Sequence, residues 1–223
     1  MNDYDFIRDL LLRPKDSIIL RTRERSLDSI ALKRAMCEKL SIWTEAGIKS
    51  GHCVALSLGM NRLDDVVSYL VAIQNQITVL PLPSEIKEAE LKYRLDIASV
   101  DFLIKTNGEI IPLNGGNALS EFPGGFISFT SGTTGLPKAI FHSWQNLISN
   151  CNSFNKLARI DSSINMLHVM PIYYMAGVLN TILSPLAAGG SICISDTFSP
   201  GSILTFWQDL VRFDLNTLWL SPT

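Results

Sequence analysis

Apolar residues recur at two different spacings along this chain, and the alternation of the two predicts its fold class. One helix face is outlined by apolar residues four or three positions apart, namely Leu32, Met36, Leu40 and Trp43. Short continuous apolar runs, such as residues 53–58, are instead typical of buried strands. Because runs of the two kinds alternate, the sequence predicts an α/β fold, with layered, mainly parallel sheets and flanking helices.

The same two patterns locate the individual elements. Strands are predicted over 53–58, 77–82, 101–105, 126–129, 139–142, 164–170, 191–195 and 217–220. Helices are predicted over 28–46, 63–74, 84–98, 144–156, 177–187 and 202–213. Pro81 and Pro83 are expected to end the second strand, and Ser84 is expected to cap the helix that follows.

Residues 107–125 differ in composition from the segments around them. Asn, Gly and Pro gather there, which is typical of a loop or of a junction between subdomains. The 223 residues are enough to bury a substantial core. We therefore expect residues 1–223 to form one partial domain, with a possible subdomain junction near 107–125.

Charge and composition exclude several classes of function. The formal net charge is −2, and 47% of the residues are apolar while 18% are charged. No excess of Lys and Arg favours nucleic acid, so no nucleic-acid partner is predicted. Residues 162–195 contain no Asp, Glu, Lys or Arg, but prolines and glycines interrupt them before an apolar run reaches the roughly 20 residues that span a bilayer. No membrane span is predicted.

The four cysteines indicate neither a metal site nor a disulfide framework. Cys37, Cys53, Cys151 and Cys193 form no CxxC pair and lie at no metal-ligand spacing from a histidine. We expect all four to be small buried apolar residues, and we predict no metal site within the chain. The first residues carry acids before a short apolar run, unlike a secretory signal, and free cysteines are typical of the cytoplasm. A cytoplasmic protein is therefore predicted.

The strongest chemical signal is the segment TSGTTGLPK, from Thr130 to Lys138. Its glycines let backbone N–H groups approach an anion closely, and consecutive N–H groups in such a turn form an anion-binding concavity. Hydroxyl side chains add donors, and Lys138 adds a positive charge. This composition suits a polyphosphate. Apolar runs on both sides predict that the loop joins two strands.

Other phosphate-binding loops fit this segment poorly. Counted from Gly132, the second glycine of a Walker A loop falls on Pro137, and the Ser or Thr after its lysine falls on Ala139. The Gly-x-Gly-x-x-Gly pattern of dinucleotide-binding folds is absent as well. A plain Ser/Gly/Thr linker is disfavoured by the apolar strands predicted on either side.

TSGTTGLPK resembles the signature loop of the adenylate-forming (AMP-binding) superfamily, which includes acyl- and aryl-CoA synthetases, peptide-synthetase adenylation domains and beetle luciferases. Four further segments resemble other N-terminal parts of that superfamily, in order: AGIKSGHCVALSLGMN, VLPLPSEIKEAELKYRL, PIYYMAGVLNTILSPLAAGG and NTLWLSPT. The resemblance covers about residues 16–223. It implies the N-terminal part of an acyl-CoA synthetase-like large domain.

The resemblance implies a two-step reaction. A carboxylic acid attacks the α-phosphate of Mg²⁺-bound ATP, and a thiol then displaces AMP; the thiol belongs to coenzyme A or to a carrier-protein phosphopantetheine. Nucleotide binding is implied for Thr130, Ser131, Gly132, Thr133, Thr134, Gly135, Pro137 and Lys138. A catalytic part, the stabilisation of the departing pyrophosphate, is implied for Thr133 and Lys138.

Tyr174 marks the expected substrate pocket. In PIYYMAG it occupies the place of the histidine in the superfamily's P-x-x-H-x-x-G segment, which borders the carboxylate pocket in acyl and aryl ligases. A phenol has one donor and is not a cation near neutral pH, although it can hydrogen-bond a carboxylate. Two interpretations stay open, a residue that lines the pocket and a tyrosine packed in the core.

Three functions are consistent with these residues. The first is an acid–thiol ligase that forms a thioester with coenzyme A. The second is a ligase that loads an acid or amino acid onto a carrier protein, and the third is a non-catalytic binding module of the same fold. The adenine, ribose and hinge motifs and the C-terminal domain of the superfamily are not found in the sequence. We therefore expect residues 1–223 to be inactive alone and to self-associate through the apolar end of the last predicted strand.

Overall fold

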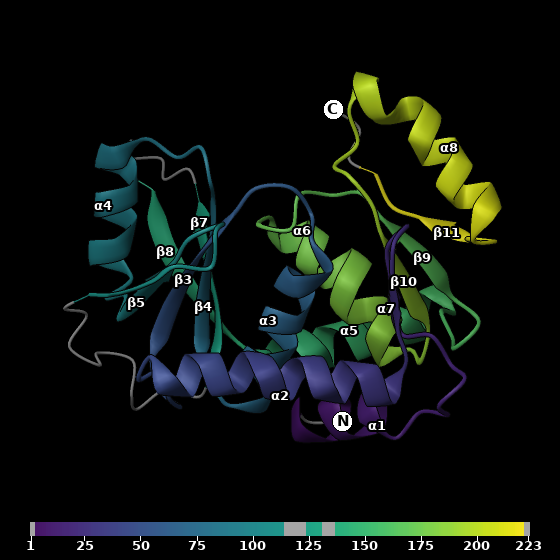
Figure 1. Cartoon of the computed structure of the whole chain (residues 1–223), viewed down its shortest axis with the longest axis horizontal. Coiled ribbons are helices and arrows are strands. Elements are labelled where there is room, and N and C mark those ends of the chain that lie inside the picture. Colours follow the sequence, from purple (N-terminus) through teal and green to yellow (C-terminus); the bar gives the residue numbers. More distant parts are fainter. Residues whose placement is uncertain (1–2, 114–123, 131–136, 221–223) are drawn as a thin grey trace.

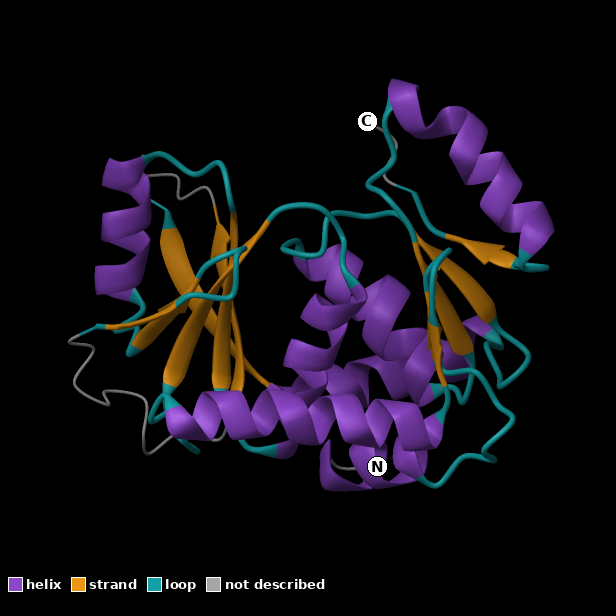
Figure 2. Cartoon of the chain, viewed as in Figure 1, coloured by secondary structure: helices purple, strands orange, loops and turns teal. Residues whose placement is uncertain are grey.

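The computed structural model describes residues 3–113, 124–130 and 137–220. In these ranges the strands form two sheets, with helices between them and outside each (Figure 1, Figure 2). The six-stranded sheet has the order β6-β5-β3-β4-β7-β8, and the five-stranded sheet has the order β11-β9-β10-β1-β2. Strands β6, β8 and β2, each at a sheet edge, run antiparallel to their neighbours, and the other pairings are parallel. The predicted fold class is confirmed.

The strands run over β1 (Leu20–Arg21), β2 (Ser26–Leu27), β3 (Cys53–Leu58), β4 (Thr78–Pro83), β5 (Phe102–Ile104), β6 (Ile110–Pro112), β7 (Gly125–Thr130), β8 (Lys138–Ser143), β9 (Asn165–His168), β10 (Ser191–Ile194) and β11 (Thr217–Leu218). The helices run over α1 (Asp3–Leu11), α2 (Ser29–Glu45), α3 (Leu63–Gln74), α4 (Glu88–Ile97), α5 (Trp144–Ala158), α6 (Met175–Val178), a π-helical turn η1 (Leu179–Leu183), α7 (Ser184–Ala187), a 3₁₀ turn η2 (Pro200–Ser202) and α8 (Ile203–Arg212).

The main core lies between the two sheets. It is built on α2, α3, α5 and the helical run from α6 to α7, whereas α4 packs outside the six-stranded sheet and α8 outside the five-stranded one (Figure 1). At its centre the rings of Tyr69, Phe126 and Trp144 lie 6.3 to 6.4 Å apart. The Tyr69 hydroxyl donates to the carbonyl of Ile172 at 2.9 Å, and Trp144 Nε1 donates to that of Ile77 at 2.9 Å. These two bonds satisfy the polar atoms of buried rings, and they connect α3 to the segment after β9 and α5 to the residue before β4.

The predicted helix cap at Ser84 is wrong. The Ser84 amide donates to the Leu58 carbonyl at 2.8 Å, so this residue still belongs to the pairing of β3 with β4. Helix α4 begins four residues later, after Lys87, and no side chain caps it. Residues 84–87 carry the chain from the end of β4 to the outer face of the sheet, where α4 packs. The preference of serine for helix caps does not reveal this connection.

Pro81 and Pro83 do not end β4, contrary to the sequence prediction. Amides of even-numbered residues face β3, because Thr78 donates to His52 and Ser84 to Leu58. The odd-numbered positions therefore face β7, and there the prolines have no N–H to donate. Accordingly β4 pairs with β7 only at Val79, opposite Phe126.

Candidate functional site

The two described ends of the TSGTTGLPK loop lie side by side on antiparallel strands. Thr130 is the last residue of β7, Lys138 is the first of β8, and the two face each other in register. Lys138 thus begins a strand, and the prediction of a loop between two strands is confirmed. Lys138 is exposed, as expected of a side chain that meets a dissolved ligand. Ser131, Gly132, Thr133, Thr134 and Gly135 lie outside the described residues, and their contacts stay predictions.

A cavity of about 650 Å³ lies beside β4 and β7. Its lining brings together the end of β4, the second half of β7 and the PIYYMAG segment, namely Pro81, Pro83, Arg94, Phe126, Ile127, Ser128, Phe129, Thr130, Met170, Tyr173, Tyr174, Met175 and Ala176. Thr130 and Tyr174, which are 44 positions apart in the sequence, therefore line one space. The predicted phosphate loop begins at the same cavity that the predicted substrate-pocket residue borders.

Tyr174 is 55% exposed and is the residue just before α6. This exposure favours lining of the cavity over packing in the core. Its neighbour Tyr173, which sequence reasoning missed, also lines the cavity, and the two rings lie 4.8 Å apart. Burial, and then the neighbouring Tyr174, raises the pKa of Tyr173 above its ordinary value, so this phenol stays neutral. A role of Tyr174 in holding a carboxylate stays a prediction.

Two residues fix the segment that carries these tyrosines. An added Cβ on Gly177 would lie 2.5 Å from the Pro171 carbonyl oxygen, so only glycine allows the segment to fold back on α6. Asn61 is buried, donates to the Ser195 carbonyl at 3.1 Å and accepts from the Ile172 amide at 3.2 Å. Asn61 ends one of the segments with a family resemblance, which is the signal that could have identified it.

His168 is a packing residue on β9. It is fully buried, and its Nδ1 lies 2.6 Å from the Thr181 hydroxyl. That hydroxyl donates to the Gly177 carbonyl, also at 2.6 Å, so it accepts the Nδ1–H of histidine. Burial lowers the pKa of His168 to about 3, and a neutral imidazole connects β9 to the helical run behind the tyrosines.

Within the described ranges, no group of three His, Cys, Asp or Glu side chains could hold a metal ion. Cys53, Cys151 and Cys193 are buried as predicted, but Cys37 is exposed on α2, which corrects the expectation for that residue. Cys37 is exposed because it follows Met36 and so falls just beside the buried stripe of α2.

None of the described helices is long and apolar enough to cross a membrane.

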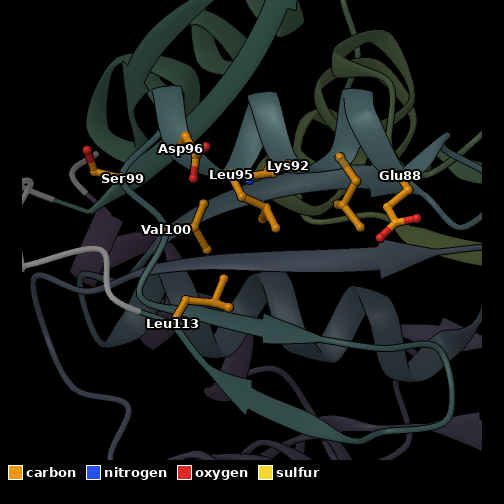
Figure 3. Close-up of a pocket in the computed structure, with 8 residues that line it drawn as sticks. Glu88, Lys92, Leu95, Asp96, Ser99, Val100 and Leu113 are labelled. Atoms are coloured by element: carbon orange, nitrogen blue, oxygen red, sulfur yellow. The ribbon is translucent and has the colours of Figure 1, made fainter.

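A second cavity, of about 470 Å³, lies against another side of α4 (Figure 3). Glu88, Lys92, Leu95 and Asp96 come from the helix, whereas Val100 lies just before β5 and Leu113 directly after β6. None of the predicted site residues that the structure describes lines this cavity. It is therefore not part of the candidate site. Lys92 lines this second cavity, whereas Arg94, on the same helix, lines the first.

Comparisons with known proteins agree with this geometry. Residues 125–223 match the model of the AMP-binding enzyme family. Sulfoacetate–CoA ligase of Cupriavidus necator is 32% identical over 97 residues, which are 44% of this chain and 18% of that protein. Oxalate–CoA ligase of Arabidopsis thaliana is 23% identical over 216 residues, which are 81% of this chain and 42% of that protein. The chain thus spans less than half the length of either relative.

A solved structure extends the likeness to the whole fold. The N-terminal subdomain of Klebsiella oxytoca NpsA, in complex with 3-hydroxybenzoyl-AMSN, superposes with a TM-score of 0.80. The match covers 98% of this chain and 59% of that one, at 16% sequence identity, and it shows the shared fold alone. Residues 125–223 thus match the AMP-binding enzyme family, and the chain is similar in sequence to CoA ligases and in fold to the N-terminal subdomain of an adenylate-forming enzyme.

Proposed function

We propose that the intact protein carrying this chain activates a carboxylic acid with Mg²⁺-bound ATP and transfers the acyl group to the thiol of coenzyme A. One observation supports this most directly. The described end of the phosphate loop, at Thr130, and the predicted acid-pocket residue, Tyr174, line one cavity of about 650 Å³. An acid and a nucleotide that meet in such a space would have their reacting atoms held together.

In the first step a carboxylate oxygen attacks the α-phosphorus, and the bond from that phosphorus to the bridging oxygen of the β-phosphate breaks. Pyrophosphate leaves with the bonding electrons, and the acyl-adenylate remains. Negative charge grows on the departing oxygens, so donors already in place near the loop lower the barrier. Lys138 supplies a positive charge, and Thr130 a hydroxyl, at the two ends of the loop. Mg²⁺ would arrive with the triphosphate, whose oxygens are its usual ligands.

In the second step a thiol attacks the acyl carbon, and the bond from that carbon to the AMP oxygen breaks. The proposal of coenzyme A as the acceptor draws on relatives named as CoA ligases that act on sulfoacetate, oxalate and malonate. The thiol of a carrier protein is the alternative acceptor, because the same chemistry serves either thiol. A product analysis with both thiols decides between them.

The test is ATP–pyrophosphate exchange with a panel of mono- and dicarboxylic acids, run on the intact protein and on residues 1–223. We expect acid-dependent exchange by the intact protein and none by residues 1–223. The reason is that contacts to the phosphates alone must first offset the translational and rotational entropy that the ligand loses on binding, about 4 kcal/mol or more. If no acid supports exchange and ATP does not raise the melting temperature of the intact protein, the chain is a non-catalytic module instead.

Replacing Tyr174 by alanine is expected to change the choice among acids more than the KM for ATP. The side chain lines the cavity from the PIYYMAG segment, which is not part of the two strands that hold the loop. We expect a change of about 10-fold in the relative kcat/KM of small and large acids, which corresponds to about 1.4 kcal/mol of differential binding. Tyr174→Phe is the control that separates the ring from the hydroxyl. Equal losses for every acid, with a lowered melting temperature, would instead identify a packing role.

A further inference from the structure

The cavity reaches both faces of the six-stranded sheet. Along β7, Phe126 packs into the core between the sheets, while Ile127 belongs to the core under α4. Side chains alternate along a strand, so Ser128 and Thr130 share the face of Phe126, and Phe129 shares that of Ile127. All five line the cavity. The lining of the cavity therefore extends from the tyrosines on one face to Arg94 of α4 on the other, and this stretch is called the passage below.

Helix α4 contacts both described ends of the phosphate loop at this passage. The Tyr93 hydroxyl donates to the Pro137 carbonyl at 3.0 Å, next to Lys138. The Arg94 guanidinium carbon lies 4.9 Å from the centre of the Phe129 ring, next to Thr130. A cation that stacks on an aromatic face is held in place with its N–H edges open to another ligand. Arg94 therefore lies close to the place where the loop begins.

Arg94 has more hydrogen-bond donors than it uses. Its Nη2 donates to Glu90 at 2.5 Å, and its Nε is buried without a hydrogen-bond partner. Five N–H groups surround a guanidinium, and among the described residues Glu90 accepts the one hydrogen bond of this side chain. The side chain is 20% exposed. Arg94 is also the one cationic side chain among the described residues that line the cavity.

We infer that Arg94 is a second binding residue for the polyphosphate: its guanidinium holds the leaving pyrophosphate from the α4 side while Lys138 acts from β8. The inference rests on the proposed function. Its support is the position of Arg94 beside the loop entrance, its unused donors, and the planar fork that suits phosphate oxygens. Glu90 competes with the phosphate for the same guanidinium, so the pair also limits how tightly pyrophosphate is retained after the reaction.

The test compares Arg94→Gln with Lys92→Gln in the intact protein. Both variants remove one positive charge from α4, but Lys92 lines the other cavity (Figure 3). For Arg94→Gln we expect the KM for pyrophosphate in the exchange assay to rise about 10-fold, with a similar rise for ATP and an unchanged KM for the acid. Lys92→Gln should leave all three values unchanged. Glu90→Gln, which frees the guanidinium, should lower the KM for pyrophosphate.

Calorimetric titration with inorganic pyrophosphate separates this inference from the proposed function. If the wild type catalyses no exchange but binds pyrophosphate, and Arg94→Gln weakens that binding about 10-fold, the proposed function fails and the inference stands. Unchanged pyrophosphate binding by Arg94→Gln overturns the inference. A rise in the KM of dicarboxylic acids alone also overturns it, because Arg94 would then recognise a second anionic group on the acid. If Arg94→Gln and Glu90→Gln lose the same pyrophosphate affinity, the ion pair serves only to stabilise α4, and the inference is overturned.

Discussion

Replacing Lys138 by alanine is expected to lower ATP use by about 10- to 100-fold in the intact protein. One charge-assisted contact to a phosphate oxygen contributes roughly 1.5–3 kcal/mol, and each 1.36 kcal/mol corresponds to a factor of ten. Lys138 is exposed and begins β8 opposite Thr130, so its removal leaves no buried cavity and no unpaired buried group. The fold should therefore survive, and the loss should appear in binding and in chemistry.

The measurement is acid-dependent pyrophosphate release at several ATP concentrations, with the melting temperature recorded for each variant. Lys156→Ala is the matched control, because Lys156 is another exposed lysine, in the last turn of α5. The loss should be the same for every acid, since the loop contacts the nucleotide and not the acid. A Lys138→Ala protein with the wild-type rate would remove this residue from the phosphate site.

Replacing Gly190 by alanine is expected to destabilise the fold by about 3–5 kcal/mol, near the upper end of single-substitution effects. An added Cβ would lie 2.4 Å from the Ile164 carbonyl oxygen and 2.1 Å from a methyl carbon of the same residue. That carbonyl accepts the Ser191 amide at 2.9 Å, at the start of the pairing of β9 with β10. The Gly190 carbonyl in turn accepts a hydrogen bond from Arg13 at 2.5 Å. Moving Ile164 away from the added Cβ would break its hydrogen bond with Ser191, and moving Gly190 would break its hydrogen bond with Arg13.

Urea unfolding of the two glycine variants measures this effect. Gly201→Ala is the control, because its added Cβ would meet no atom closer than 3.9 Å. We expect Gly201→Ala to remain within about 0.5 kcal/mol of the wild type and Gly190→Ala to melt roughly 10 °C lower. Equal stability of the two variants would mean that the turn between α7 and β10 relaxes freely, and it would contradict the close packing of Gly190 against Ile164.

The long strands and helices could be predicted because each contains enough residues to reveal its period. Strand β3 and helix α3 have the predicted bounds of 53–58 and 63–74. Strands β1 and β2 have two residues each and are held by their neighbours, so no periodicity exists to detect. Helix α1 was missed for a related reason, since nine residues give little more than two turns. Such short elements form because tertiary packing stabilises them.

The candidate site was predicted only in part. TSGTTGLPK and PIYYMAG are continuous in sequence, so their residues could be named in advance. Arg94 and Asn61 reach the site through packing between distant segments, and hydrophobic periodicity carries no information on such contacts; the family resemblance of the segments that contain them is the one signal for either residue. The lack of donors toward β7 likewise depends on which side of β4 the prolines face. That side follows from the register of β3 against β4, which becomes known only when the fold is known.

The prolines of β4 also bear on how this fold can acquire new substrates. Pro81 and Pro83 line the cavity, and they leave β4 without N–H groups to donate toward β7 beyond Val79. Lining side chains such as Ser128 and Met175 can therefore be exchanged without changing the pairing of β4, because the missing hydrogen bonds do not depend on them. Under the proposed function, strand pairing and acid preference are then encoded at different positions. A library that varies the other lining residues while it retains Pro81 and Pro83 should yield folded proteins with altered acid preference, whereas one that varies the two prolines should extend the pairing of β4 with β7.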